Sequence, residues 1–80
     1  MTSHFTKADQ GRALKEWNCS KDLLLRALVN IGEHDFGKAA DELQDAIVSL
    51  RELQQMKDYK ELQDKAIALL RKVDSNEQIR

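Results

Sequence analysis

Three adjacent ionisable residues, Glu33, His34 and Asp35, are the densest group of potential ligands in the 80-residue chain. Carboxylates and imidazole bind zinc and act as general acids and bases, so this triplet could carry metal or acid–base chemistry. Consecutive residues in a turn point in different directions, however, whereas a metal needs convergent ligands. We therefore interpret the triplet as a solvated turn in which Asp35 caps the next helix, and we predict no metal site and no cofactor.

The other reactive side chains have no visible partner in the sequence. His4 lies in an N-terminal arm, and Cys19 has no local base that would activate its thiol. A small apolar role in the interior is the favoured interpretation of Cys19. Catalysis needs titratable groups that converge in a concave pocket, and a chain with two histidines and one cysteine offers few of them. The sequence therefore predicts that the protein is not an enzyme.

Apolar residues are concentrated between Leu23 and Ile31, where only Arg26 and Asn30 are polar. A helix that is apolar around so much of its girth needs a central position or a partner, and 80 residues leave little chain to surround it. Trp17, the lone tryptophan, is either a core residue, which we favour, or an interface anchor. The residues that we expect to bind a partner are Trp17, Leu24, Leu25, Leu28, Val29 and Ile31.

A helix over residues 36–56 organises the rest of the predicted fold. Its apolar residues recur at spacings of three and four, which is typical of a helix packed along another helix. Large and small side chains alternate, so that a partner helix could approach closely at the alanines. Gly32 marks the break before this helix. The predicted seam consists of Phe36, Ala39, Leu43, Ala46, Leu50 and Leu53.

Two helices are predicted upstream, over residues 7–17 and 21–31. Asn18 and Ser20 are poor formers of helix interiors, so we favour a bend or an interruption between the two. One continuous helix fits the same apolar spacing and remains the alternative.

A last helix is predicted over residues 59–74. Asp58 and Glu61 have the spacing of a capping box, which favours a turn near Lys57–Asp58. The alternative is one long helix in which the apolar pattern changes phase. We expect residues 1–5 to form a flexible arm and residues 77–80 a frayed tail.

The start of the 36–56 helix resembles the second helix of a tetratricopeptide repeat. In that family an aspartate and an aromatic residue open the helix, as Asp35 and Phe36 do here, and small residues let two helices pack closely. The resemblance covers residues 35–47. Arg51 stands where the family usually closes a repeat with proline, and no full second repeat follows. The resemblance therefore implies a similarly packed helical hairpin, and not membership of the family.

The composition is that of a single small all-α domain spanning residues 1–80. The chain has no proline, three glycines and 34% charged residues, and it is rich in good helix formers. A lone cysteine excludes an intramolecular disulfide, so helix packing or oligomerisation must supply the stability. We predict a small bundle of three to four helices in antiparallel helical hairpins, with the 36–56 helix at its centre.

The charge pattern limits the kinds of partner. Thirteen basic and 14 acidic residues are interspersed, whereas a general nucleic-acid binder needs a basic patch. No apolar run approaches the roughly 20 residues of a membrane span. The N-terminal segment lacks the plan of a signal peptide, and a single cysteine suits a reducing cytosol. We expect a cytoplasmic protein without nucleic-acid or membrane partners.

The favoured function is a non-enzymatic protein–protein interaction module: a small helical adaptor, chaperone-like factor or regulatory subunit that self-associates into a homo-oligomer. On this hypothesis, charged residues in place of Leu25 and Val29 should abolish association. The alternative is a helix-turn-helix-type, nucleic-acid-linked regulator built from residues 7–17 and 21–31. Its second helix would need polar residues that read bases, but this one carries three consecutive leucines, Leu23 to Leu25.

Overall fold

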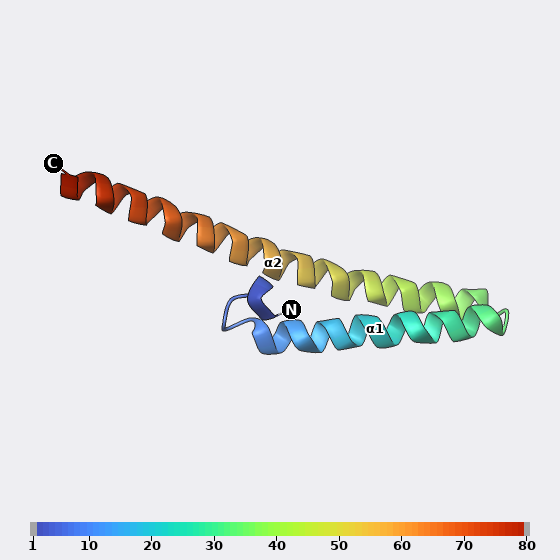
Figure 1. Ribbon diagram of the computed structural model, residues 1–80. Helices are drawn as coiled ribbons and strands as arrows, with labels where there is room; N and C mark the ends of the chain where they lie inside the picture. Colours follow the sequence, from blue (N-terminus) through green and yellow to red (C-terminus); the bar gives the residue numbers. More distant parts are fainter. Residues whose placement is uncertain (1, 80) are drawn as a thin grey trace.

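The computed structural model describes residues 2–79, and within them the side chains of residues 3–72. A short 3₁₀ turn, η1 (Thr2–His4), precedes two long helices, α1 (Gln10–Gly32) and α2 (Phe36–Ile79), and the described residues contain no strand. The two helices run antiparallel and form a hairpin, and the second half of α2 continues far beyond α1 (Figure 1).

The all-α prediction is confirmed, but the predicted number of helices is wrong, because the chain forms two long helices instead of three or four. α1 runs through Asn18 and Ser20 without a break. Ser20 is buried, and its hydroxyl donates a 2.8 Å hydrogen bond to the carbonyl oxygen of Trp17. The polar group of Ser20 is thus satisfied inside the helix, so an interruption is not needed.

α2 also continues through the turn predicted at Lys57–Asp58. Asp58 accepts a 2.8 Å hydrogen bond from the side chain of Gln54, and Lys60 Nζ lies 2.6 Å from Asp64 Oδ1. Such pairs, four residues apart, stabilise a helix, so the polar side chains that indicated a cap instead support an uninterrupted helix. The alternative of one long helix with a shift in its apolar pattern is the correct one.

The loop at residues 33–35 reverses the chain as predicted. Asp35 caps α2, because its Oδ1 accepts a 3.2 Å hydrogen bond from the N–H of Lys38. His34 has a φ of 63°, in the left-handed region, and the N–H of Asp35 donates a 2.8 Å hydrogen bond to the carbonyl oxygen of Asn30. This is a Schellman motif in which histidine takes the position usually occupied by glycine.

Most of the buried residues of α1 and α2 have small side chains. Ala13, Ser20 and Ala27 are buried at seven-residue intervals along α1. Ala39 and Ala46 are buried at the same interval along α2. Seven-residue spacing keeps one line of each helix against the other, and the small volume of these residues lets the two backbones approach closely. We call these two lines the small-residue seam.

The predicted seam of the 36–56 helix is therefore only partly correct. Its alanines face α1, and Leu53 is half-buried beside them. Its three other members are exposed: Phe36, Leu43 and Leu50. The physical reason is the close approach of the helices at the alanines, which leaves no space for large side chains there.

Phe5, the last residue of the arm predicted over residues 1–5, packs against the hairpin. Phe5 is 7% exposed and forms a buried cluster with Ala13 and Met56. This cluster lies where α1 begins, so it closes the open end of the hairpin. α1 itself begins at Gln10, three residues later than predicted.

The second half of α2 has no partner within the described chain. α1 has 23 residues and α2 has 44, so 21 residues, which we call the overhang (59–79), extend beyond the hairpin. Residues 61–72 are all exposed. The molecule is a rod of 70 × 18 × 14 Å with a radius of gyration of 19.2 Å, where a compact domain of this length has about 12 Å. Of the predicted tail over 77–80, Arg80 lies outside the described residues.

Leucine in place of Ala27 or Ala46, each 1% exposed, should lower the free energy of unfolding by about 1–3 kcal/mol, because extra methylenes overpack a closely spaced contact. Urea denaturation followed by circular dichroism at one protein concentration measures this loss. Ala68→Leu, an exposed position in the overhang, is the matched control and should change stability by less than about 0.5 kcal/mol. Equal losses at all three positions would contradict the close approach.

His34→Gly should raise the free energy of unfolding. A non-glycine residue in the left-handed region costs about 1–2 kcal/mol, and the greater flexibility of unfolded glycine offsets about 0.5–1 kcal/mol of the gain. Glu33→Gly is the control, because Glu33 has a φ of −88° and gains nothing from glycine. Thermal unfolding should show a higher midpoint for His34→Gly and a lower one for Glu33→Gly, and the reverse order would refute the strain at His34.

Candidate interaction surface

The six residues predicted to bind a partner are all exposed side chains of α1. Their exposed fractions range from 41% at Leu24 to 65% at Leu28. Trp17 is 43% exposed, so the core position that the sequence favours for it is wrong. These large side chains give α1 an extensive exposed apolar surface.

An ion pair defines the two sides of the hairpin. Arg12 directly precedes Ala13 of the small-residue seam. Glu52 directly precedes Leu53, which continues the α2 line of the seam seven residues after Ala46, and Arg12 Nη2 lies 2.8 Å from Glu52 Oε2. Residues that directly precede a seam position on either helix therefore share one side. In an antiparallel pair of helices, residues four positions after a seam residue share the opposite side. We call the side that carries Arg12 and Glu52 the polar side, and the opposite side the apolar side.

The apolar side carries large side chains from both helices, and each is at least 38% exposed. We call this set the apolar face: Leu14, Trp17, Leu24, Leu28 and Ile31 of α1, with Phe36, Leu43, Ile47 and Leu50 of α2. Lys21 interrupts the face on α1, and its Nζ lies 5.3 Å from the centroid of the Trp17 ring. This cation–π contact directs the ammonium group along the face and not away from it.

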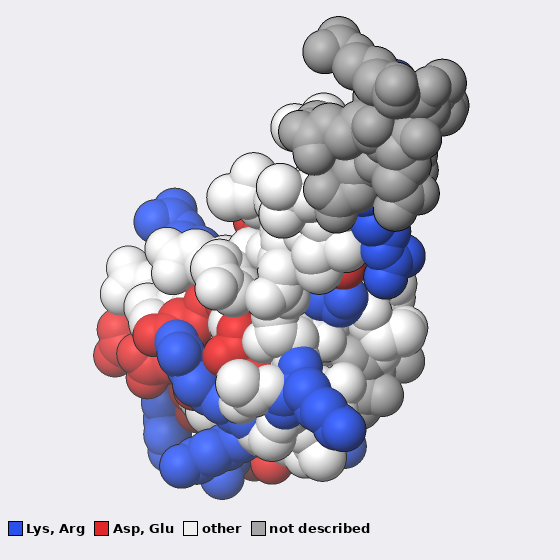
Figure 2. All heavy atoms as spheres, turned by 90° about the vertical axis from the view of Figure 1, so that its left-hand side faces the viewer, with Lys and Arg blue, Asp and Glu red and all other residues white. Residues whose placement is uncertain are grey.

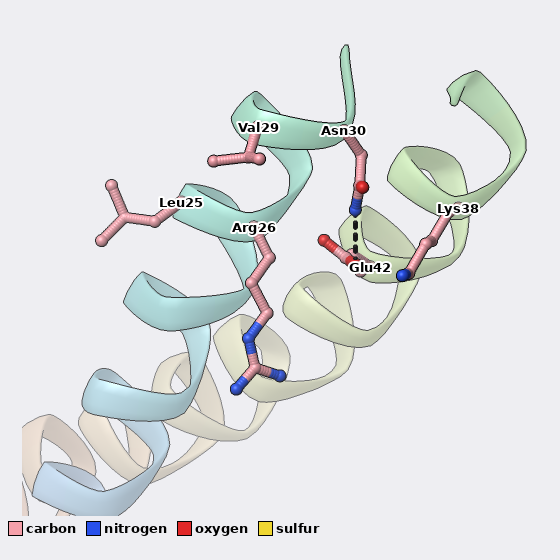
Figure 3. Close-up of a pocket in the computed structure, with 6 residues that line it drawn as sticks. All are labelled: Leu25, Arg26, Val29, Asn30, Lys38 and Glu42. Atoms are coloured by element: carbon pink, nitrogen blue, oxygen red, sulfur yellow. Dashed lines mark hydrogen bonds between the residues drawn. The ribbon is translucent and has the colours of Figure 1, made fainter. Parts of the chain in front are cut away.

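Leu25 and Val29 do not belong to the apolar face. They line an open groove of about 490 Å³ with Arg26 and Lys38, which directly precede seam residues and so mark the polar side. Figure 3 shows Leu25 and Val29 pointing away from α2, while Arg26 extends towards it. Leu25 and Val29 are thus separated from the four other predicted residues, which all belong to the apolar face: Trp17, Leu24, Leu28 and Ile31.

A buried polar pair crosses the hairpin at this groove. Asn30 is 8% exposed, and its Nδ2 donates a 2.7 Å hydrogen bond to Glu42 Oε1 (Figure 3). The second carboxylate oxygen, Oε2, is buried and has no hydrogen-bond partner in the described part of the chain. A shift of α1 along α2 would leave these buried polar groups without partners and so cost stability. The pair therefore fixes the register of α1 against α2.

The other chemical candidates do not converge. Cys19 is exposed, so its predicted role as a buried apolar residue is wrong. In the loop, Asp35 is engaged as a cap, and the ring of His34 meets that of Phe36 edge-on at 5.8 Å. Within the described residues, no three His, Cys, Asp or Glu side chains are grouped so that they could hold a metal ion.

Charged side chains of both signs are interspersed. In Figure 2, which looks along the molecule from the overhang end, basic and acidic residues lie next to one another. The hydrogen bond with Glu52, and then the charge of Glu52, raise the pKa of Arg12, but an exposed ion pair of this kind adds little stability. No helix in the part of the chain that the structure describes is long and apolar enough to cross a membrane.

Sequence reasoning missed the α2 half of the apolar face, because it placed Phe36, Leu43 and Leu50 in the seam. A signal was present: these large residues recur every seven positions, and Ala39 and Ala46 form a second line with the same interval. Two lines of different side-chain size on one helix indicate two different contacts.

No protein-family model, curated protein or solved structure matches this chain. The resemblance of residues 35–47 to a tetratricopeptide helix therefore gains no support from the comparisons, and the surface has to be interpreted from its own geometry.

Asn30→Ala should lower the free energy of unfolding by about 1–3 kcal/mol, because it leaves the Glu42 carboxylate buried without its donor. Asn18→Ala, at an exposed position of the same helix, is the control and should be close to neutral. The double variant Asn30→Leu/Glu42→Leu should recover most of the loss. Urea denaturation of the four proteins measures these changes, and a double variant that is no more stable than Asn30→Ala would refute the pair.

Proposed function

We propose that this protein is a non-enzymatic protein–protein interaction module, of the kind found in small helical adaptors, chaperone-like factors and regulatory subunits, and that it self-associates. One observation carries the proposal: the apolar face extends over both helices, and no element among the residues that the structure describes covers it. A monomeric soluble protein rarely exposes a contiguous apolar patch of more than a few hundred Å² unless the patch binds something.

The energetics favour binding at this face. Complete burial of one large apolar side chain contributes about 1.5–3 kcal/mol, and the face contains several that are about half exposed, such as Trp17 and Ile31. Aromatic residues within an apolar patch are typical centres of binding energy. Trp17 and Phe36 provide one on each helix.

The overhang supplies a second surface for a partner. Its exposed apolar residues include Leu62, Leu69 and Leu70. Most of the stability of a helix in a protein comes from tertiary packing, so a protein that binds these apolar residues would also stabilise the overhang. A cytosolic setting suits the proposal, because the exposed thiol of Cys19 remains reduced there.

The alternative, a helix-turn-helix-type regulator of nucleic acid, is not favoured by any observation. That motif needs two helices joined by a short turn, and α1 is continuous over residues 18–20, where the turn would lie.

Capture experiments with the tagged full chain, in extracts of the cells that make it, test the proposal. The wild type and Leu25→Lys/Val29→Lys should retain the same proteins. Leu24→Lys/Leu28→Lys on the apolar face, or Leu62→Lys/Leu69→Lys on the overhang, should reduce the retained amount of at least one captured protein by tenfold or more. That protein can be a second copy of this chain. Identical sets from all four proteins would overturn the assignment.

A further inference from the structure

We infer that the occupant of the apolar face is a second copy of this chain, and that the two hairpins pack through this face into a four-helix bundle. The inference rests on the proposed function and specifies both the partner and the surface. Each copy would contribute α1 and the first half of α2.

The surface area of the chain supports a partner of this size. The chain exposes 6405 Å², whereas a compact monomer of 9.2 kDa exposes about 4,900 Å², so roughly 1,500 Å² is in excess. Part of this excess belongs to the overhang, which stays in water. If the apolar face accounts for half of it, a pair would bury about 1,500 Å², which is the size of a stable, specific interface. A second hairpin presents an apolar face of the same extent over two helices, whereas a single short helix is narrower.

The chemistry of the face also suits self-association. A two-fold interface brings the same patch of both copies together, so the patch must be complementary to itself. Apolar side chains meet this condition without any matching of charge. The net charge of −1 per chain also gives little repulsion between copies.

Lys21 is compatible with such an interface. Its ammonium group already contacts the Trp17 ring, and a long lysine side chain can cover apolar surface with its methylene groups while the charge reaches water at the edge.

The side chains on the polar side of the hairpin are placed so that they stay in water when the two apolar faces meet. Arg12, Glu52 and Cys19 lie on the polar side, so the bundle leaves them in water. Four helices around one apolar core form a closed arrangement, whereas one hairpin is a single layer with its face uncovered. The overhangs extend beyond the bundle and remain accessible.

Light scattering behind a sizing column, over a hundredfold range of concentration, tests the interface with the full chain. The wild type should have twice the 9.2 kDa mass of the chain. Leu24→Lys/Leu28→Lys should dissociate the dimer, with a dissociation constant at least 100-fold higher. Leu25→Lys/Val29→Lys is the matched control, shifted by one residue along α1, and should remain dimeric, as should Leu62→Lys/Leu69→Lys.

Trp17 gives a second readout that needs no variant. It is the only tryptophan, and the bundle would bury it. Dilution of the wild type through its dissociation constant should therefore shift the emission to longer wavelength in parallel with the loss of mass. This measurement decides the matter if circular dichroism shows that Leu24→Lys/Leu28→Lys loses its helices.

The outcomes separate the inference from the proposed function. A wild type that is monomeric at every concentration overturns the inference, while the capture experiment still decides whether other proteins bind. A dimer that is broken by Leu25→Lys/Val29→Lys or by Leu62→Lys/Leu69→Lys, and not by the pair on the apolar face, overturns the inference and leaves self-association intact.

Discussion

Alanine and serine side chains, repeated at seven-residue intervals, bring the α1 and α2 backbones close together along most of the hairpin. Large side chains, Leu53 and Met56, pack between the helices only at the open end. The other large residues of both helices must then occupy the flanks of the contact. In α2 the consequence is direct: Ala39 and Ala46 are buried, and Leu43, four residues after the first of them, is exposed. The hairpin thus gains a close contact and, by the same geometry, an uncovered apolar surface.

The small-residue seam provides little hydrophobic stabilisation of its own, because burying an alanine removes little apolar area from water. The larger buried contributions come from Phe5 and Met56 at the open end, and from the pairing of Asn30 with Glu42 near the loop. A hairpin fixed at its two ends and closely packed between them has a defined register. Any molecule that binds the remaining surface of the folded hairpin would add to its stability.

Local features of the fold could be predicted from the sequence, and long-range ones could not. The cap at Asp35 and the end of α1 at Gly32 follow from a few neighbouring residues, and both are confirmed. The break expected at Asn18–Ser20 and the turn expected at Lys57–Asp58 depend on where polar side chains find partners. Ser20 finds one within its own helix, and propensity alone does not reveal this.

The candidate surface shows the same division. Side-chain type alone identified six large apolar residues of α1 as candidates for a binding surface, and all six are exposed. Their assignment to sides of the hairpin required the position of the seam, which depends on how closely the helices approach. Leu24 and Leu25 are adjacent and chemically identical, and only the position of Ala27 in the seam places them on different surfaces.

The continuity of α2 has a consequence for how the chain can change in length. An α-helix turns by about 100° per residue, so the apolar face and the line of Leu62, Ala66 and Leu69 are held at a fixed rotation, roughly a quarter of a turn apart. One residue inserted near Met56 would swing the overhang by about 100°, whereas seven would lengthen it by about 10 Å and restore the rotation to within about 20°. Length variation in this segment is therefore constrained to steps of about seven residues wherever both surfaces must be engaged at once.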